Sequence, residues 1–84
     1  MVYTYIVRCA DGTLYTGWAA NLEKRLVAHN AGTGAKYTRN RLPVELVYFE
    51  HQENQGAAQK RESSLKKLKR CQKLALIQGF RLSQ

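Results

Sequence analysis

The sequence has little of what stabilises secreted or membrane proteins. Its 84 residues include one proline and two cysteines. Cys9 and Cys71 are too few and too far apart for the disulfide framework of a small secreted domain. We therefore expect a cytoplasmic location, with both cysteines as small core residues. No apolar run approaches the roughly 18 residues that span a bilayer, so we expect no membrane segment.

Acidic residues are scarce as well. Fourteen Lys and Arg residues face six Asp and Glu residues, which gives a net charge of +8. Such an imbalance attracts polyanions such as nucleic acid or an anionic membrane surface. Seven of the basic residues gather in one stretch: Lys60, Arg61, Lys66, Lys67, Lys69, Arg70 and Lys73. A solvated helix face that serves solubility is the alternative explanation for this charge.

Residues 1–84 contain no internal repeat, linker or low-complexity tract, and we expect one domain with a small core. With 44% apolar and 24% charged residues, the composition is that of a soluble globular protein. The pattern of alternating and helical segments predicts the order ββαβαα. This order favours an α+β fold, in which a small three-stranded antiparallel sheet is flanked by three helices.

The first two strands form a hairpin over residues 3–18. Alternation along the first arm and the Thr, Tyr and Trp residues of the second arm are typical of half-buried strands. The turn has two solutions, which propensity alone leaves open. A two-residue Asp11-Gly12 turn places Tyr5 and Tyr15 on opposite faces, whereas a three-residue loop with Gly12 at positive φ places them on one face. Only the second solution can build one site from both phenols.

Three helices and a third strand follow the hairpin. The first helix begins after its N-cap, Asn21, and ends at His29 or Asn30. Then come a loop over residues 31–43, a largely buried strand over 44–49, a helix from 55 or 56 to 70, and a short helix over 72–78 that Gly79 ends. Arg25 and His29 form an i, i+4 pair at the edge of the first helix, from which both can reach the core. Ordinary surface positions are the alternative for this pair.

The loop over residues 31–43 combines cations with one aromatic residue. Tyr37 lies among Lys36, Arg39 and Arg41, which suits phosphate contacts together with one stacking or hydrogen-bonding ring. The glycines of this loop lack the spacing of a Walker motif, which argues against a nucleotide-binding P-loop. The loop is therefore a candidate contact for nucleic acid.

One acidic residue stands in the most basic stretch of the chain. Glu62 is the only acid between Lys60 and Lys73, and helical spacing places it at the edge of the inward-facing stripe. A carboxylate at this position weakens the attraction for polyanions, so its presence suggests a local role. The alternative is an intrahelical ion pair with Lys66, four residues further on.

Together these residues resemble the GIY-YIG nuclease superfamily, most closely its small single-domain bacterial branch. Tyr3-Thr4-Tyr5 stands where that family has Gly-Ile-Tyr, and Tyr15-Thr16-Gly17 stands for Tyr-Ile-Gly. Arg25 follows the second motif's tyrosine by ten residues, and His29 follows by four more. This is the spacing that the family's catalytic helix shows.

The resemblance implies a reaction and a set of residues. Glu62 matches the family's metal-binding glutamate, and residues 34–39 followed by 43–47 are typical of the small branch. The implied reaction is metal-dependent hydrolysis of DNA phosphodiester bonds, in DNA repair or recombination, with one Mg²⁺ or Mn²⁺ ion. The implied catalytic residues are Tyr5, Tyr15, Arg25 and His29, with Gly17 as a structural motif residue. The basic stretches add candidate DNA contacts at Lys36, Tyr37, Arg39, Arg41, Lys66, Lys69 and Arg70.

In this interpretation, Arg25 stabilises charge on the phosphate, and Tyr15 activates or orients the water, with Tyr5 and His29 beside it. Such a single site requires both tyrosines on one face, so we expect the three-residue loop with Gly12 at positive φ. Two other functions stay open. A DNA-binding module of the same fold, with little intrinsic cleavage, also fits the basic helix. An accessory subunit would dock through its C-terminal helix to a protein partner that supplies specificity.

Overall fold

The computed structural model describes residues 2–82 of the chain. Three strands, β1 (Val2–Arg8), β2 (Leu14–Ala19) and β3 (Glu45–Gln52), form an antiparallel sheet. Four helices accompany it in this part of the chain: α1 (Leu22–Asn30), α2 (Lys36–Arg39), α3 (Gln55–Lys66) and α4 (Arg70–Leu82). The predicted α+β class and the order ββαβαα are confirmed. The short helix α2 is an addition in the segment that we expected to be a loop.

The hairpin of β1 and β2 closes through a three-residue loop. The Gly12 N–H donates to the Cys9 carbonyl oxygen at 2.9 Å, and Gly12 has a φ of +87°. Glycine adopts this left-handed conformation without the strain that a side chain would add. Val7 then pairs with Tyr15. The expected register is therefore confirmed, and Tyr5 and Tyr15 share one face of the sheet.

β1 is the central strand, because the sheet has the order β2-β1-β3. Its odd-numbered side chains pack with Leu26 of α1, and Ile6 packs with Leu65 of α3 and Ile77 of α4. We expected a half-buried strand, but residues 4–7 are all buried. The reason is that helices cover both faces of the sheet.

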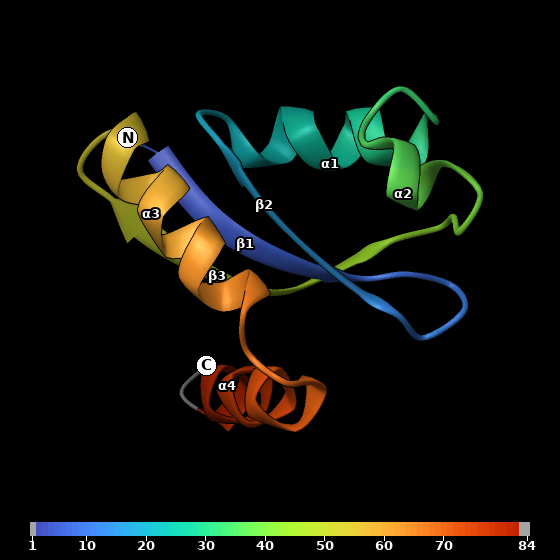
Figure 1. Cartoon of the computed structure of the whole chain (residues 1–84). Coiled ribbons are helices and arrows are strands. Elements are labelled where there is room, and N and C mark those ends of the chain that lie inside the picture. The colour runs from blue at the N-terminus through green and yellow to red at the C-terminus, as the bar shows by residue number, and fades with distance from the viewer. Residues whose placement is uncertain (1, 83–84) are drawn as a thin grey trace.

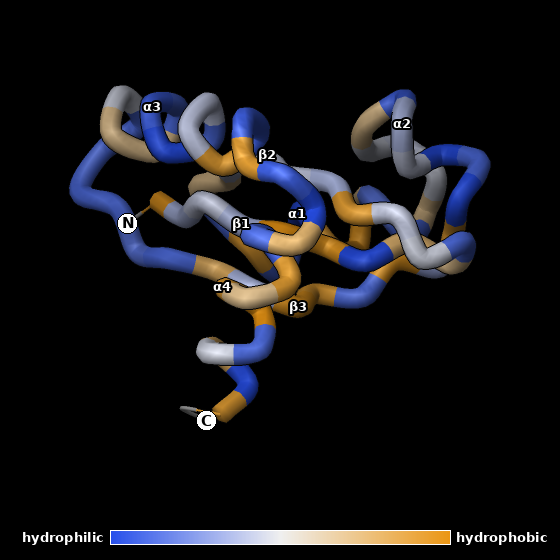
Figure 2. Tube along the Cα trace, turned by 60° about the horizontal axis from the view of Figure 1, so that its bottom comes forward, coloured by the Kyte–Doolittle hydropathy of each residue, from blue (hydrophilic) through white to orange (hydrophobic). Residues whose placement is uncertain are grey.

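Figure 1 shows α1 and α2 above the strands and α4 below them. α3 packs on β1 and β2, while α4 packs on β3. Hydrophobic residues concentrate along the strands at the centre, whereas α3 and the segment around α2 are mainly hydrophilic (Figure 2). No helix within residues 2–82 is long and apolar enough to cross a lipid bilayer. This arrangement places the tyrosine-bearing face of the hairpin under α1.

The two C-terminal helices have other boundaries than the sequence predicted. α3 ends at Lys66 instead of Arg70, and α4 continues through Gly79 to Leu82. A glycine in a helix interior costs about 1 kcal/mol relative to alanine. Packing offsets this cost, because the next residue, Phe80, lies against two aromatic rings of β3 with centroid distances of 5.4 and 5.2 Å.

Burial differs from expectation at two places. Cys9 is a buried core residue as expected, but Cys71 is exposed, because Ile77 sets the buried face of α4 and Cys71 lies on another. The third strand is less buried than we expected. β3 is an edge strand, and Val47 is its one buried residue.

Candidate active site

Tyr5 occupies the centre of the face that α1 covers. Its side chain is fully buried, and its Cα pairs with that of Gly17 on β2. A Cβ atom at position 17 would lie 2.7 Å from Tyr5 Oη and 3.2 Å from Tyr15 Cε2. Glycine is therefore required at this position, since both tyrosine rings lie against its backbone.

α1 brings Arg25 and His29 to the hydroxyl of Tyr5. The helix begins at its N-cap, where the Asn21 side chain accepts from the Lys24 N–H at 3.0 Å. Arg25 Nε donates to Tyr5 Oη at 3.3 Å, and His29 Nε2 lies 2.8 Å from the same oxygen. The i, i+4 spacing thus places both side chains on a single phenol.

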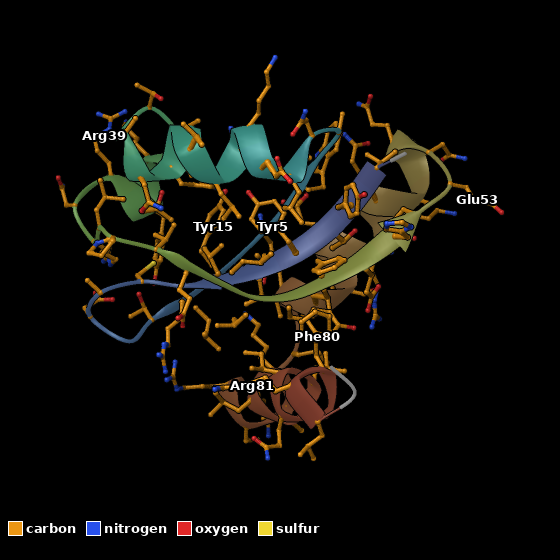
Figure 3. The ribbon with its side chains drawn as sticks, turned by 180° about the vertical axis from the view of Figure 1, so that it is seen from behind. Tyr5, Tyr15, Arg39, Glu53, Phe80 and Arg81 are labelled. Carbon is orange, nitrogen blue, oxygen red and sulfur yellow. The ribbon has the colours of Figure 1, made fainter. Side chains whose placement is uncertain are left out.

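Tyr15 joins this cluster from β2. Figure 3 shows Tyr5 and Tyr15 between α1 and the sheet. The Tyr15 ring stands edge-on to His29, with ring centroids 5.6 Å apart, and stacks on Tyr37 of α2 at 5.8 Å. Tyr5 and His29 are fully buried, whereas Tyr15 is only half-buried. Tyr15 is therefore the phenol of the pair that a substrate can reach.

Burial and one cation set the charges within the cluster. Burial raises the pKa of Tyr5 above its usual value, although the hydrogen bond from Arg25 opposes this rise. Burial, together with the charge of Arg25, lowers the pKa of His29. The hydrogen bond to Tyr5 raises the pKa of Arg25. At neutral pH the cluster therefore holds a neutral Tyr5 phenol, a neutral imidazole and a guanidinium cation.

Glu62 of α3 lies within electrostatic reach of the cluster, since its charge adds to burial in raising the pKa of Tyr5. Its side chain is 20% exposed, and its Oε2 lies 3.3 Å from Lys66 Nζ, which is the intrahelical pair considered from the sequence. Glu50, another acid close to α3, is held by Arg61 through two hydrogen bonds of 2.9 Å. Glu62 is therefore the carboxylate that can bind a metal ion at this site.

The donor set fits one hard divalent cation. Within residues 2–82, no three side chains of His, Cys, Asp or Glu come together as a metal site. Structural zinc and calcium sites draw most of their ligands from the protein. Mg²⁺ and Mn²⁺, by contrast, accept one carboxylate together with waters and substrate phosphate oxygens. Glu62 meets this requirement, so the residues present fit a Mg²⁺ or Mn²⁺ ion.

The candidate DNA contacts on and after α2 differ in whether their side chains already have partners within the protein. Lys36 and Arg39 are exposed on either side of Tyr37, and Figure 3 shows Arg39 at the outer edge of the molecule. Arg41 is engaged within the protein. Its guanidinium lies 4.2 Å from the Tyr37 ring centroid and pairs with Asp11 at 3.1 Å. A phosphate at Arg41 therefore has to compete with an existing carboxylate partner.

The candidates at the end of α3 and the start of α4 divide in the same way. Lys66 pairs with Glu62, whereas Lys69 is exposed. Arg70 Nη2 donates to the carbonyl oxygen of Gly12 at 3.0 Å and so ties α4 to the hairpin loop. Two of these three cations thus have intramolecular partners that a phosphate has to replace or share.

Two residues that contact His29 were not predicted from the sequence. Thr38 Oγ1 lies 2.9 Å from His29 Nδ1, and a Cβ atom at Gly34 would lie 2.5 Å from the same nitrogen. Both residues belong to the segment 34–39, which we had associated with the small branch of the family. Their residue types carry no signal of this contact, because it depends on the unexpected turn of helix at α2.

We expect Gly17→Ala to destabilise the protein by about 1–3 kcal/mol, the usual cost of overpacking. Tyr5 is fully buried and cannot retreat from the added methyl group. Gly79→Ala is the matched control, because no atom beyond its chain neighbours and the adjacent backbone of its own helix lies within 4 Å of its Cβ position. Alanine there should instead stabilise α4 by about 0.5–1 kcal/mol. Urea unfolding measures both changes, and a Gly17→Ala protein as stable as wild type would contradict the close packing.

A hairpin with one tyrosine on each arm, an Arg–His helix packed on it and a glutamate on a later helix define the class of protein. Residues 1–75 match the model of the GIY-YIG catalytic domain. The chain therefore belongs to the GIY-YIG family. Within this family it is similar to the UPF0213 proteins. It is 64% identical to the UPF0213 protein CPE1444 of Clostridium perfringens over 77 aligned residues. The alignment covers 92% of this chain and 83% of the relative.

Other relatives show the same similarity. The chain is 51% identical over 75 residues to the UPF0213 protein of Natronomonas pharaonis, which covers 89% of this chain and 88% of that protein. The solution structure of the UPF0213 protein from Bacillus halodurans superposes with a TM-score of 0.59 at 38% identity, over 93% of this chain and 84% of the other. For a protein from E. faecalis the TM-score is 0.62 at 44% identity, over 95% and 85% of the two chains. The resemblance expected from the sequence is confirmed.

Proposed function

We propose that this chain is a DNA endonuclease that hydrolyses phosphodiester bonds with one Mg²⁺ or Mn²⁺ ion. The observation that carries the proposal is the buried Tyr5 hydroxyl, which holds the guanidinium of Arg25 near the accessible phenol of Tyr15. Membership of the GIY-YIG family supports a nuclease activity. The net charge of +8 supports a polyanionic substrate.

Arg25 binds the phosphate in this proposal. Its Nε is occupied by Tyr5 at 3.3 Å, so the Nη side of the guanidinium, which also interacts with Tyr15, would bind the non-bridging oxygens. Guanidinium matches such oxygens in a bidentate arrangement. The side chain is half-buried, so its charge is less screened than on an open surface. Arg25 thus stabilises the negative charge that develops in the transition state.

Tyr15 activates or orients the attacking water. Tyr5 is unsuited to this role because it is fully buried and burial keeps it a neutral phenol. Tyr15 is half-buried, and its ring is fixed between His29 and Tyr37. Tyr5 and His29 therefore act as the support on which Arg25 and Tyr15 are positioned.

Glu62 would hold the divalent ion, which when bound supplies neutralisation of the phosphate oxygens and a more acidic water. The Lys66 ammonium, 3.3 Å from Glu62 Oε2, keeps the carboxylate in place without a ligand. An intrahelical pair at i, i+4 is worth only about 0.3–0.5 kcal/mol. Lys66 can therefore leave Glu62 at little cost.

The basic residues position the DNA backbone and carry no sequence information of their own. The proposed contacts are Lys36, Tyr37, Arg39, Arg41, Lys66, Lys69 and Arg70. Cys9 and Cys71 are free thiols, which supports a cytoplasmic location. We place the activity in DNA repair or recombination, with a protein partner that supplies specificity.

Neutralising the cations on α2 should weaken DNA binding equally for all sequences. For each of Lys36→Ala and Arg39→Ala, we expect the slope of log K against log salt to fall by about 0.9, because one phosphate contact is lost. Fluorescence anisotropy across a salt series measures the slope. Arg81→Ala is the control, since Arg81 lies on α4, away from α2 (Figure 3). An unchanged slope in the α2 variants would mean that these side chains are merely solvated.

A cleavage assay on branched, nicked, single-stranded and duplex DNA tests the proposed function. We expect at least one of these substrates to be cut with Mn²⁺ or Mg²⁺ and none to be cut in EDTA. Binding measured on the same substrates separates an enzyme from a binding module. Wild-type protein that binds DNA but cuts none of these substrates with either metal would overturn the proposal.

A further inference from the structure

A continuous chain of hydrogen bonds runs from Arg25 to the backbone of the segment before α2. Arg25 Nε donates to Tyr5 Oη at 3.3 Å, and Tyr5 Oη lies 2.8 Å from His29 Nε2. His29 Nδ1 lies 2.9 Å from Thr38 Oγ1, which donates to the Ala35 carbonyl oxygen at 3.0 Å. The chain thus connects the proposed phosphate-binding residue to a threonine that has no other assigned role.

A neutral histidine carries one ring N–H, so its two nitrogens have opposite roles. Burial and the charge of Arg25 lower the pKa of His29 and keep the ring neutral. The imidazole is fully buried, and a Cβ at Gly34 would lie 2.5 Å from Nδ1. Thr38 Oγ1, at 2.9 Å, is the hydrogen-bond partner of Nδ1 in this buried position.

The hydrogen bonds from Arg25 to Ala35 can run in two directions, and the two arrangements differ by one hydrogen bond. If His29 Nδ1 carries the proton, it donates to Thr38, Thr38 donates to Ala35, Tyr5 donates to His29, and every donor is used. If Nε2 carries the proton, it donates to the Tyr5 oxygen, which already accepts from Arg25. The buried Tyr5 O–H is then left without an acceptor among its bonded neighbours. An unpaired buried donor is costly, so the first direction is favoured.

We propose that Thr38 is a positioning residue that sets the tautomer of His29 and thereby keeps His29 from competing with Arg25 as a donor to Tyr5 Oη. Its effect on DNA cleavage rests on the proposed function above. When Nδ1–H donates to Thr38, Nε2 accepts a hydrogen bond from the Tyr5 O–H. The free lone pairs of Tyr5 Oη then face the guanidinium. Arg25 Nε is then fixed, and its Nη groups keep one orientation toward the phosphate.

Loss of the threonine hydroxyl should remove the preference for the first direction. Thr38→Val keeps the shape but offers no acceptor to His29 Nδ1–H, so each tautomer now leaves one buried donor unpaired, and the two form equal numbers of hydrogen bonds. The ring should therefore populate the Nε2–H form as well, in which His29 and Arg25 both donate to the Tyr5 oxygen. We expect a looser Arg25 and cleavage slowed by up to about tenfold, the equivalent of one hydrogen bond. DNA affinity should stay unchanged.

Long-range ¹H–¹⁵N correlation spectra of the histidine rings test the proposal directly. We expect a protonated Nδ1 and a bare Nε2 in wild type. In Thr38→Val both ring nitrogens should shift toward the values of an Nε2-protonated ring, and Thr38→Ser should restore the wild-type pattern. His51, the other histidine of the chain, is the internal reference because its ring contacts Tyr3 outside the cluster.

Thr33→Val is the matched control. It removes a threonine hydroxyl that donates to the Ala28 carbonyl oxygen at 3.2 Å on the surface, and it should change neither the His29 spectrum nor cleavage. A wild-type ring protonated at Nε2, or a Thr38→Val ring protonated at Nδ1 as fully as in wild type, would overturn the proposal. A Thr38→Ser ring with the same pattern as Thr38→Val would overturn it too.

The spectra do not depend on nuclease activity, so the two proposals fail separately. If wild-type protein cuts no DNA, the proposed function falls while the tautomer measurement still decides the role of Thr38. If the tautomer changes as expected and cleavage is as fast in Thr38→Val as in wild type, the link from Thr38 to Arg25 is refuted.

Discussion

Glu62→Gln is expected to abolish divalent-dependent DNA cleavage, with a loss of about a thousandfold or more. Glutamine keeps the size of the side chain but removes the charge that a hard cation requires. A bound divalent ion contributes several kcal/mol of transition-state stabilisation, and each 1.36 kcal/mol or so is a factor of ten in rate. DNA affinity without metal should stay equal or rise, because the change removes a negative charge from the most basic stretch of the chain.

Metal binding itself gives a second readout for Glu62. Paramagnetic Mn²⁺ should broaden the NMR signals of residues around Glu62 in wild type and leave them sharp in Glu62→Gln. Glu53→Gln is the control for the same chemical change, since Glu53 is exposed ahead of α3 (Figure 3). Cleavage at nearly the wild-type rate in highly purified Glu62→Gln protein would refute the metal assignment.

Arg25→Lys should slow cleavage by about a hundredfold, although it preserves the positive charge. Lysine offers a point charge in place of the planar fork, and it loses the Nε donor that Tyr5 holds at 3.3 Å. Removal of one donor that is aimed at developing charge costs about 100- to 1000-fold in other enzymes. DNA affinity should change little, because the total charge is the same. Single-turnover cleavage and anisotropy on the same DNA separate the two quantities.

Arg81→Lys provides the matched control for this substitution. Arg81 lies on α4, away from Tyr5 and Tyr15 (Figure 3), so the same exchange there should leave the cleavage rate unchanged. An Arg25→Lys protein that cleaves as fast as wild type would show that the guanidinium fork does not bind the reacting phosphate.

The hairpin was predictable because its pattern and its function require the same register. Alternation along β1 and a glycine that accepts positive φ allow few turns, and only one of them places Tyr5 and Tyr15 together. Helical spacing likewise placed Arg25 and His29 on one edge of α1. These features depend on residues close in sequence, whose geometry is local.

Features that depend on tertiary contacts were not predictable. Gly79 has the residue type of a helix stop, yet α4 passes through it because the following aromatic ring packs on β3. Thr38 reaches His29 only because α2 turns back over α1. In both cases, a contact between two different secondary-structure elements decides the local structure, which propensity alone does not describe.

The central claim is that this chain hydrolyses DNA by activating a water. The most direct measurement is mass spectrometry of DNA cleaved by wild-type protein with Mn²⁺ in ¹⁸O-labelled water. Hydrolysis predicts incorporation of ¹⁸O into the phosphate at each cut end and no cut ends in EDTA. Cut ends without ¹⁸O, or bound DNA that stays intact with every divalent metal, would contradict the account.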